Sequence, residues 1–169
     1  MHIEKRLFLG YFQDIFLNGI FSCTLCVVLG KFFTVWKYAP GFQVGPKRAF
    51  DIGWAEAVAV ELGMCLAIQL NLLQGSNILV NLDNSRIVTV VNKGQLRSLE
   101  TNKILKHIYL LQAKTNVQLH TTYVLSCDNI SDALSQGQIL EFLQGFPLAC
   151  TQVTIPLPEH LIDKLVPWS

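Results

Sequence analysis

Carboxylates are scarce in this sequence, so the positions that they occupy carry information. Asp and Glu together number 12 among 169 residues, and charged residues make up only 15%. Glu56 lies within an apolar stretch, Asp83 ends a short apolar run, and Asp132 begins a late helical segment. Because a lone charge in apolar surroundings is costly, a divalent cation is one partner that could compensate these groups. Each acid could equally be a helix cap or a solvated surface group.

The elements that would position these carboxylates are a long helix and a short strand. Trp54–Leu73 is apolar nearly all round and predicts a buried helix, with Asp51 as its N-cap. Glu61 lies about 140° around this helix from Glu56, so it is poorly placed to share a site with it. Asn77–Leu82 predicts a buried strand that ends directly before the second acid.

The remaining segments complete an α/β domain with a mixed sheet. Thr24–Gly30 and Phe32–Lys37 predict a hairpin, and Ser98–Gln112 has apolar positions at helical spacing. The other predicted elements are a short strand over Ile15–Leu17, a short helix over Asn84–Val91, a strand over Val117–Leu125 and a helical turn over Ile130–Ser135. Three strands, a helix, a strand, helices, a strand and a helix make an α/β order.

Composition excludes a strongly basic nucleic-acid-binding protein. The formal net charge is +1, so any contact with nucleic acid must depend on local positive charge. Hydrophobic residues make up 51% of the chain, which suits a sheet with helices packed on its faces. The odd count of five cysteines favours reduced thiols and an intracellular location, with cytoplasm and nucleus not distinguished.

Three motifs resemble the ribonuclease H-like domain of fungal retrotransposon (reverse transcriptase) polyproteins. DIGWAEAVAVEL over Asp51–Leu62 is similar to that family's helix motif, and VNLDNS over Val80–Ser85 is similar to its strand that ends in an aspartate. NISDALSQG over Asn129–Gly137 is similar to the closing element. The resemblance covers roughly Phe16–Gly137, and the order and spacing of the short motifs make it fairly specific.

The resemblance implies a five-stranded mixed sheet, with three antiparallel strands followed by parallel strands, flanked by helices. It implies a two-metal site for Mg²⁺ or Mn²⁺ that hydrolyses the RNA strand of an RNA/DNA hybrid. The metal ligands that it assigns are Glu56, Asp83 and Asp132. The residues expected to contact nucleic acid are Asn84, Lys93 and Arg97. For Lys93 and Arg97, the alternative is that they are ordinary solvated surface side chains.

The chain departs from the family in its first strand, where Asn18 stands in place of a metal-binding aspartate. That aspartate contacts both ions, whereas an asparagine offers one neutral carbonyl oxygen. We therefore expect a degenerate domain that binds nucleic acid and hydrolyses it poorly. One alternative is an active Mg²⁺-dependent ribonuclease H, in which Asn18 is tolerated or Asp14 takes its place. Another is a non-enzymatic relic or interaction domain.

The sequence divides into three parts on this interpretation. Residues 1–13 are an unassigned N-terminal segment, residues 14–145 form the domain, and residues 146–169 are a proline-rich tail. The family domain follows a polymerase, so the chain is either expressed alone or part of a larger polyprotein with a reverse transcriptase. The apolar run Ile15–Phe33 raises the alternative of a membrane-associated protein, but polar residues interrupt it, so we expect no membrane partner.

Overall fold

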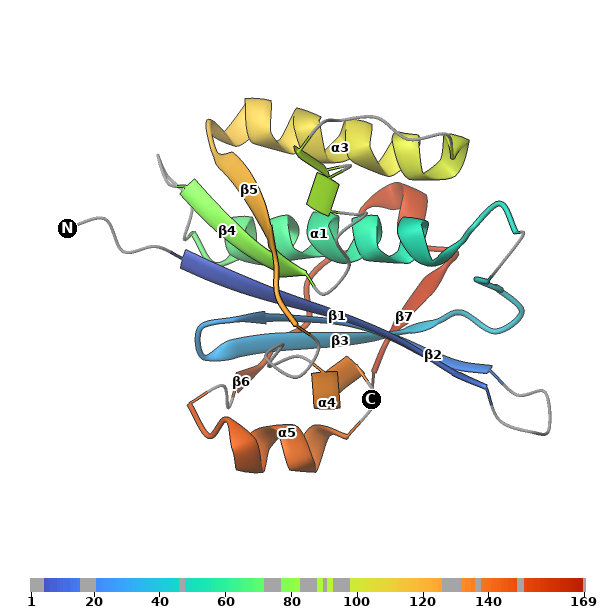
Figure 1. Cartoon of the computed structure of the whole chain (residues 1–169), viewed down its shortest axis with the longest axis vertical. Coiled ribbons are helices and arrows are strands. Elements are labelled where there is room, and N and C mark those ends of the chain that lie inside the picture. Colours follow the sequence, from blue (N-terminus) through green and yellow to red (C-terminus); the bar gives the residue numbers. More distant parts are fainter. Residues whose placement is uncertain are drawn as a thin grey trace.

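One mixed sheet organises the chain (Figure 1). The computed structural model describes the backbone of residues 5–15, 21–45, 48–71, 77–82, 88–89, 91–92, 98–125, 132–135, 138–148 and 151–168. Side chains are described within these ranges except for residues 5–15, 21–24, 132 and 135. The strands are β1 (Lys5–Ile15), β2 (Phe21–Leu29), β3 (Phe32–Tyr38), β4 (Asn77–Leu82), β5 (Gln118–Tyr123), β6 (Thr151–Gln152) and β7 (Leu165–Pro167).

The order of the strands confirms the expected mixed sheet. Across the sheet it is β5-β4-β1-β2-β3-β6, and β7 also pairs with β3. The β1–β2 and β2–β3 pairs are antiparallel. β4 runs parallel to β1, and β5 runs parallel to β4. The five main strands therefore form an antiparallel half and a parallel half that meet at β1.

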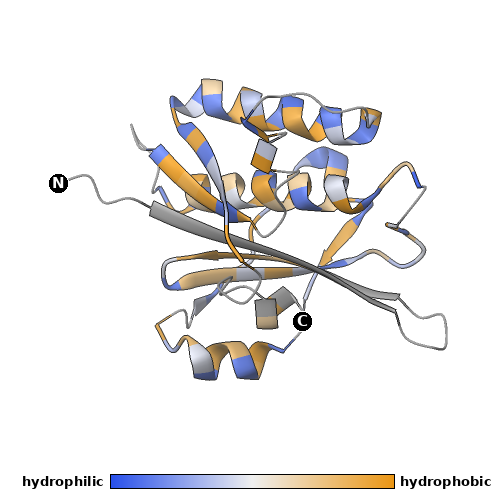
Figure 2. Ribbon diagram, viewed as in Figure 1, coloured by the Kyte–Doolittle hydropathy of each residue, from blue (hydrophilic) through white to orange (hydrophobic). Residues whose placement is uncertain are grey.

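Helices cover both faces of this sheet (Figure 1). α1 (Ile52–Gln69) packs on one face, and α3 (Leu99–Thr115) packs against α1. α4 (Asp132–Ser135) and α5 (Ile139–Gly145) lie on the other face, where Leu134 and Phe142 are buried with Cys26 and Val28. The inner helix α1 is mostly apolar, whereas the outer helix α3 alternates apolar and polar residues (Figure 2).

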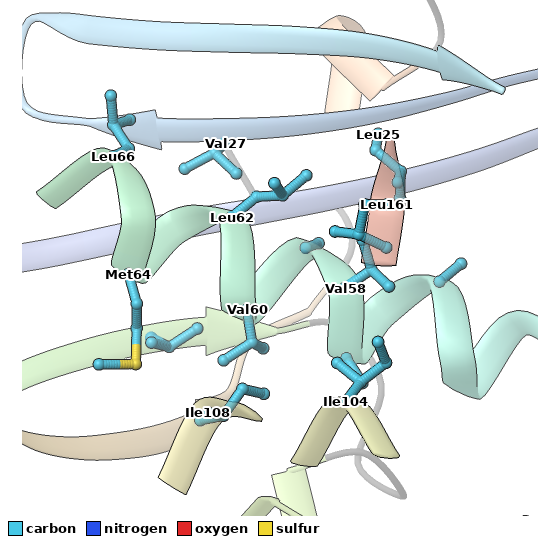
Figure 3. Packing of buried hydrophobic residues seen from close by; sticks show 14 of the residues in the cluster. Leu25, Val27, Val58, Val60, Leu62, Met64, Leu66, Ile104, Ile108 and Leu161 are labelled. Carbon is cyan, nitrogen blue, oxygen red and sulfur yellow. The ribbon is translucent and has the colours of Figure 1, made fainter. Parts of the chain in front are cut away.

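α1 is a core helix because apolar side chains project from nearly all of its sides. Leu62 lies near Val27 of the sheet, while Met64 lies on the side of α1 that faces Ile108 of α3 (Figure 3). The helix is long and apolar enough to cross a membrane, yet 72% of its 18-residue window is buried inside the protein. Packing on two sides accounts for its composition. The run Ile15–Phe33, which raised the membrane alternative, contains β2 rather than a helix among its described residues.

Local signals mark the ends of the main helices, although the sequence predicted other last residues: Leu73 for α1, which ends at Gln69, and Gln112 for α3, which ends at Thr115. The Asp51 carboxylate accepts a hydrogen bond from the Trp54 N–H at 2.9 Å, which confirms the N-cap of α1. The Ser98 hydroxyl accepts from the Thr101 N–H at 3.3 Å at the start of α3. α3 ends where Asn116 adopts a left-handed conformation with φ 52°.

The first strand lies earlier in the sequence than predicted. The sequence predicts a short strand over Ile15–Leu17, whereas β1 spans Lys5–Ile15, most of it within the unassigned segment 1–13. It pairs with β2 from Leu7–Leu29 to Ile15–Phe21. Pairing with both β2 and β4 decides where β1 lies, and such long-range pairing leaves no local signal in the sequence.

The residues that were predicted to form a proline-rich tail contribute two strands to the sheet. β6 runs parallel to the start of β3, and β7 runs antiparallel to its end. Between them, the 3₁₀ helix η2 (Glu159–Leu161) returns to the other side of the sheet, where Leu161 is buried against α1. Pro167 is tolerated in β7 because a terminal position on an edge strand need not donate a backbone hydrogen bond.

Candidate functional site

Glu56 is a buried carboxylate in the second turn of α1. Only 8% of the residue is exposed, and the helix that carries it contacts both β1 and β2. Burial on this scale is uncommon for a glutamate without a compensating partner. The expectation that Glu56 lies within the core helix is confirmed.

The parallel strands β4 and β5 end together, which defines the edge where the second predicted acid follows. Leu82 pairs with Tyr123, and the Val124 N–H donates to the Leu82 carbonyl at 2.8 Å. Asp83 follows Leu82 directly in the sequence but lies outside the described residues. The carboxyl ends of parallel strands in α/β sheets are the usual place for ligand sites. The predicted residues Asn18, Asn84, Lys93 and Arg97 also lie outside the described residues.

Asp132 is the first residue of α4, and its side chain is not described. α4 contacts β1 and β2, and Leu134 packs among the core residues on the face opposite α1. The elements α1 and α4 therefore contact β1 from opposite faces of the sheet.

The register between β1 and β4 identifies the part of β1 that lies level with the end of β4. Phe8 pairs with Asn81 in parallel register. Gly10 is two residues beyond Phe8, just as Asp83 is two residues beyond Asn81 in the sequence. Asp14, the one acidic residue in the sequence of β1, is four residues further, or about 13 Å at 3.3 Å per residue.

Hydrogen bonds between Asn92 and Thr121 anchor the segment that connects β4 to α3 on strand β5. The Asn92 amide donates to the Thr121 carbonyl at 3.3 Å, and its Oδ1 accepts from the Thr121 N–H at 3.3 Å. The Thr121 hydroxyl lies 2.8 Å from Asn92 Oδ1 and 3.0 Å from the Val88 carbonyl oxygen. The Tyr109 hydroxyl donates to the Val91 carbonyl at 2.9 Å. β5 and α3 thus hold the described part of this segment, residues 88–89 and 91–92, while the four predicted site residues in the segment lie outside the described residues.

A second polar cluster lies elsewhere on α1. Glu61, which is 2% exposed, is 2.9 Å from Nε2 of His160 in η2. The rings of His107 in α3 and His160 stack with centroids 3.9 Å apart. The sequence indicated that Glu61 would not share a site with Glu56, but it held no sign of this pairing because Glu61 and His160 are 99 residues apart.

The charges of this second cluster are suppressed by its surroundings. Burial raises the pKa of Glu61 to about 7, although the charge of His107 opposes the change. Burial, followed by repulsion from His160, lowers the pKa of His107. Burial, followed by repulsion from Lys164, lowers the pKa of His160. The lowered pKa values favour the neutral form of both imidazoles, so the rings can stack without repulsion. Because His160 is then uncharged, its contact with Glu61 is a hydrogen bond rather than an ion pair.

Known proteins resemble this chain in structure, but the sequence comparisons found no match. No protein-family model and no curated protein sequence matches the chain. The structure is similar to ribonuclease H1 from the archaeon Halobacterium salinarum, with a TM-score of 0.59 and 13% identity over 82% of this chain and 98% of that chain. It is also similar to the N-terminal RNase H domain of a Mycobacterium tuberculosis protein, with a TM-score of 0.55 and 13% identity over 84% and 99% of the two chains.

A viral protein shows the same likeness. The foamy viral protease-reverse transcriptase, solved in complex with dsDNA, aligns with a TM-score of 0.57 and 12% identity over 79% of this chain and 92% of that chain. At these identities the likeness concerns the fold, and the residues of the candidate site are not compared by it. The antiparallel and parallel halves of the sheet, the helices on both faces and these three matches show that the chain has the ribonuclease H-like fold.

Proposed function

We propose that this chain is a nucleic-acid-binding ribonuclease H-like domain of retrotransposon origin in which metal-dependent hydrolysis is impaired. The observation that carries the proposal is the absence of a suitably placed acid in the sequence of β1. Asp14 is its one acidic residue, and it lies about 20 Å along the strand from the Phe8–Asn81 pair. A ligand must lie about 2 Å from a bound Mg²⁺ ion, so Asp14 is not expected to share an ion with a residue that follows β4.

Two ways of locating the missing acid lead to the same expectation. The family motif assigns the position to Asn18, whereas the β1–β4 register points to Gly10. Asn18 offers a single neutral oxygen, and Gly10 has no side chain to offer. Asp14 is four residues from each in the sequence, and within β1 it is about 13 Å from Gly10. On either assignment, the site lacks the negative charge that would bridge two cations about 3.5–4 Å apart.

The acids that remain fit one hard cation better than two. Glu56 is a buried oxygen donor in the core helix, and the motifs assign Asp83 and Asp132 beside it. These three residues would hold Mg²⁺ or Mn²⁺, which prefer carboxylate oxygens. Such an ion supplies activation of water and stabilisation of the leaving oxygen. With the bridging carboxylate missing, we expect cleavage to fall by orders of magnitude.

We expect nucleic-acid binding to remain although catalysis is impaired, because the residues expected to bind nucleic acid differ from those that would hold the metal ion. Asn84, Lys93 and Arg97 occur in the segment between β4 and α3, and Asn92 and Tyr109 hold two described parts of that segment in place. The net charge of +1 gives little general attraction for phosphate, so affinity should depend on these local cations. Replacing Lys93 and Arg97 with alanine should weaken binding and flatten its dependence on salt, with a slope reduced by about 0.7–0.9 for each phosphate that is no longer neutralised.

A restoration experiment tests the proposal. Cleavage of an RNA/DNA hybrid would be followed in Mg²⁺ and in Mn²⁺ for the chain as it stands, for Asn18→Asp and for Gly10→Asp. One of the two variants should cleave at least about 100-fold faster than the unaltered chain, a difference of about 2.7 kcal/mol in the barrier. Adding Glu56→Gln should remove the restored activity. If the unaltered chain cleaves as fast as both variants, the impairment is refuted.

A binding measurement tests the other half of the proposal. Fluorescence anisotropy with a labelled hybrid, at low salt and with a chelator present, measures affinity without cleavage. The unaltered chain and Glu56→Gln should bind alike. Binding of neither protein at low salt would contradict the proposal that the domain recognises nucleic acid, whatever the cleavage assay gives.

A further inference from the structure

Glu61, His107 and His160 converge from α1, α3 and η2, three elements that are distant in the sequence. Glu61 Oε2 is 2.9 Å from His160 Nε2. The two imidazole rings are nearly parallel, with an interplanar angle of 6° and centroids 3.9 Å apart. One donor atom from each of the three residues lies within 4.8 Å of the other two. The cluster begins on a side of α1 about 140° from Glu56, so it is separate from the acidic site.

We infer that Glu61, His107 and His160 form a binding site for a Zn²⁺ ion. Two imidazoles and one carboxylate are a donor set that zinc uses where three protein ligands leave one position for water. Mg²⁺ and Ca²⁺ prefer sets made only of oxygen atoms, so this set should discriminate against them. The inference goes beyond the proposed nucleic-acid function and does not depend on it.

The three donors are close enough to share an ion after small side-chain movements. Zinc bonds of about 2.0–2.2 Å in a tetrahedral arrangement place neighbouring donor atoms roughly 3.3 Å apart. Glu61 and His160 already lie within that distance. The parallel rings must tilt, because the in-plane lone pairs of stacked imidazoles do not meet at one point. The His160 side chain is 28% exposed and has room to rotate.

A cavity beside the histidines leaves space for the fourth ligand. It has a volume of about 410 Å³ and is lined by both His107 and His160. Charged side chains also line it, among them Glu100, Lys103, Glu159, Asp163 and Lys164. Water can therefore reach an ion bound between the imidazoles and Glu61.

The position of the cluster gives the ion a structural consequence. His160 belongs to η2, and the next residue, Leu161, is buried against α1. An ion held by all three side chains would tie the C-terminal segment to α1 and α3. Because binding to the folded state alone stabilises it, zinc should raise the unfolding temperature of the whole chain.

Titration of the metal-free protein with zinc tests the inference. The full chain, purified without a histidine tag and stripped with a chelator, should bind one Zn²⁺ per chain by calorimetry. Co²⁺ in its place should give the visible absorption of a tetrahedral complex. The unfolding temperature should rise by about 5–10 °C at a free zinc concentration 100-fold above Kd. Failure to bind one equivalent of zinc overturns the inference.

Variants locate the ion. Glu61→Gln, His107→Ala and His160→Ala should each weaken zinc binding by at least about 100-fold, since even residues that only orient ligands contribute about 10–100-fold. His120→Ala is the matched control because His120 is an exposed histidine on β5, and it should bind as the unaltered chain does. Glu56→Gln should also bind normally. Loss of binding in Glu56→Gln, or unchanged binding in all three ligand variants, contradicts the assignment.

A readout on the unaltered chain keeps the test valid if a variant fails to fold. Zinc should shift the ring resonances of His107 and His160 in the NMR spectrum and leave those of His120 unchanged. Shifts confined to other histidines, or no shift at saturating zinc, overturn the inference.

Discussion

The contact between Asn92 and Thr121 closes the free edge of the sheet. β5 is the outermost strand beside β4, so the outward N–H and C=O of Thr121 have no strand partner among the described residues. The side-chain amide of Asn92 supplies one donor and one acceptor to these two groups. The Asn92 amide therefore takes the place of a neighbouring strand at this residue. It satisfies the backbone N–H and C=O of Thr121 and prevents another chain from pairing with them. Its removal should therefore cost stability.

The magnitude follows from the number of hydrogen bonds and from their exposure. Asn92→Ala removes two bonds to the backbone of Thr121 and one acceptor of its hydroxyl. A net hydrogen bond contributes about 1 kcal/mol. Because Asn92 is exposed, water can replace part of the pairing, so we expect about 1–2 kcal/mol. Thr121→Val keeps the shape of a side chain that is 7% exposed and removes its hydroxyl, which should cost about 1 kcal/mol.

A double-mutant cycle in urea measures this interaction directly. The two single variants share the 2.8 Å hydrogen bond between hydroxyl and amide, so the double variant should be less destabilised than the sum by about 0.5–1 kcal/mol. Thr122→Val, on the next residue of β5, is the control and should change the free energy of unfolding by less than about 0.5 kcal/mol. The reasoning is refuted if Asn92→Ala is as stable as the unaltered chain, or if the two substitutions are additive.

Three further predictions concern described parts of α1. Leu62 is fully buried beneath the sheet, so Leu62→Ala should lower the free energy of unfolding by about 2–5 kcal/mol in a urea titration. Asp51→Ala removes the N-cap bond to Trp54 and should cost about 1 kcal/mol, which Asp51→Ser should largely recover. Burial, followed by the charge of Glu61, raises the pKa of Cys65 to about 12 from the ordinary 9.0. Only about 1 in 10⁴ of the Cys65 thiols is then ionised at pH 8, against roughly 1 in 10 for an ordinary thiol. Peptide mapping after iodoacetamide treatment at pH 8 should show labelling about 1000-fold slower than in urea, and comparable rates would contradict the shift.

The elements that were predicted correctly carry their signals locally. Asp51 was predicted as the N-cap of the core helix, and its side chain accepts a hydrogen bond from the backbone N–H three residues ahead. The predicted start of the next long helix, Ser98, is one residue from the observed start of α3 at Leu99. Gly30, with φ 60°, forms the turn between β2 and β3, and the sequence placed a hairpin there. β4 has the predicted bounds because a six-residue apolar run is short enough to favour a buried strand over a helix.

The features that were missed depend on contacts between distant residues. β1 was placed about ten residues too late because its position is set by pairing with β2 and β4 rather than by any turn or cap. The C-terminal prolines suggested a tail, yet the Trp168 N–H donates to the Val35 carbonyl at 3.0 Å across the sheet. His160 is isolated in the sequence and reaches Glu61 only through the whole fold.

In the candidate site, too, the sequence indicates single residues and does not indicate which of them come together. Glu56 was singled out in the sequence because a charge within an apolar helix is conspicuous at a single position, and the structure shows it buried in α1. The convergence of Glu56 with Asp83 and Asp132 stays a prediction. The register of β1 adds a position, Gly10, that sequence motifs did not single out. It gives the restoration experiment a second design.

The central claim is that the chain has the fold of a ribonuclease H without its full activity. The most direct test is the single-turnover rate at which the unaltered chain cleaves an RNA/DNA hybrid at saturating Mg²⁺, measured beside Glu56→Gln. We predict that the two rates are the same within error, because a site without its bridging acid gains little from Glu56. A rate for the unaltered chain that exceeds that of Glu56→Gln by about 100-fold or more, and disappears with chelator, would contradict it.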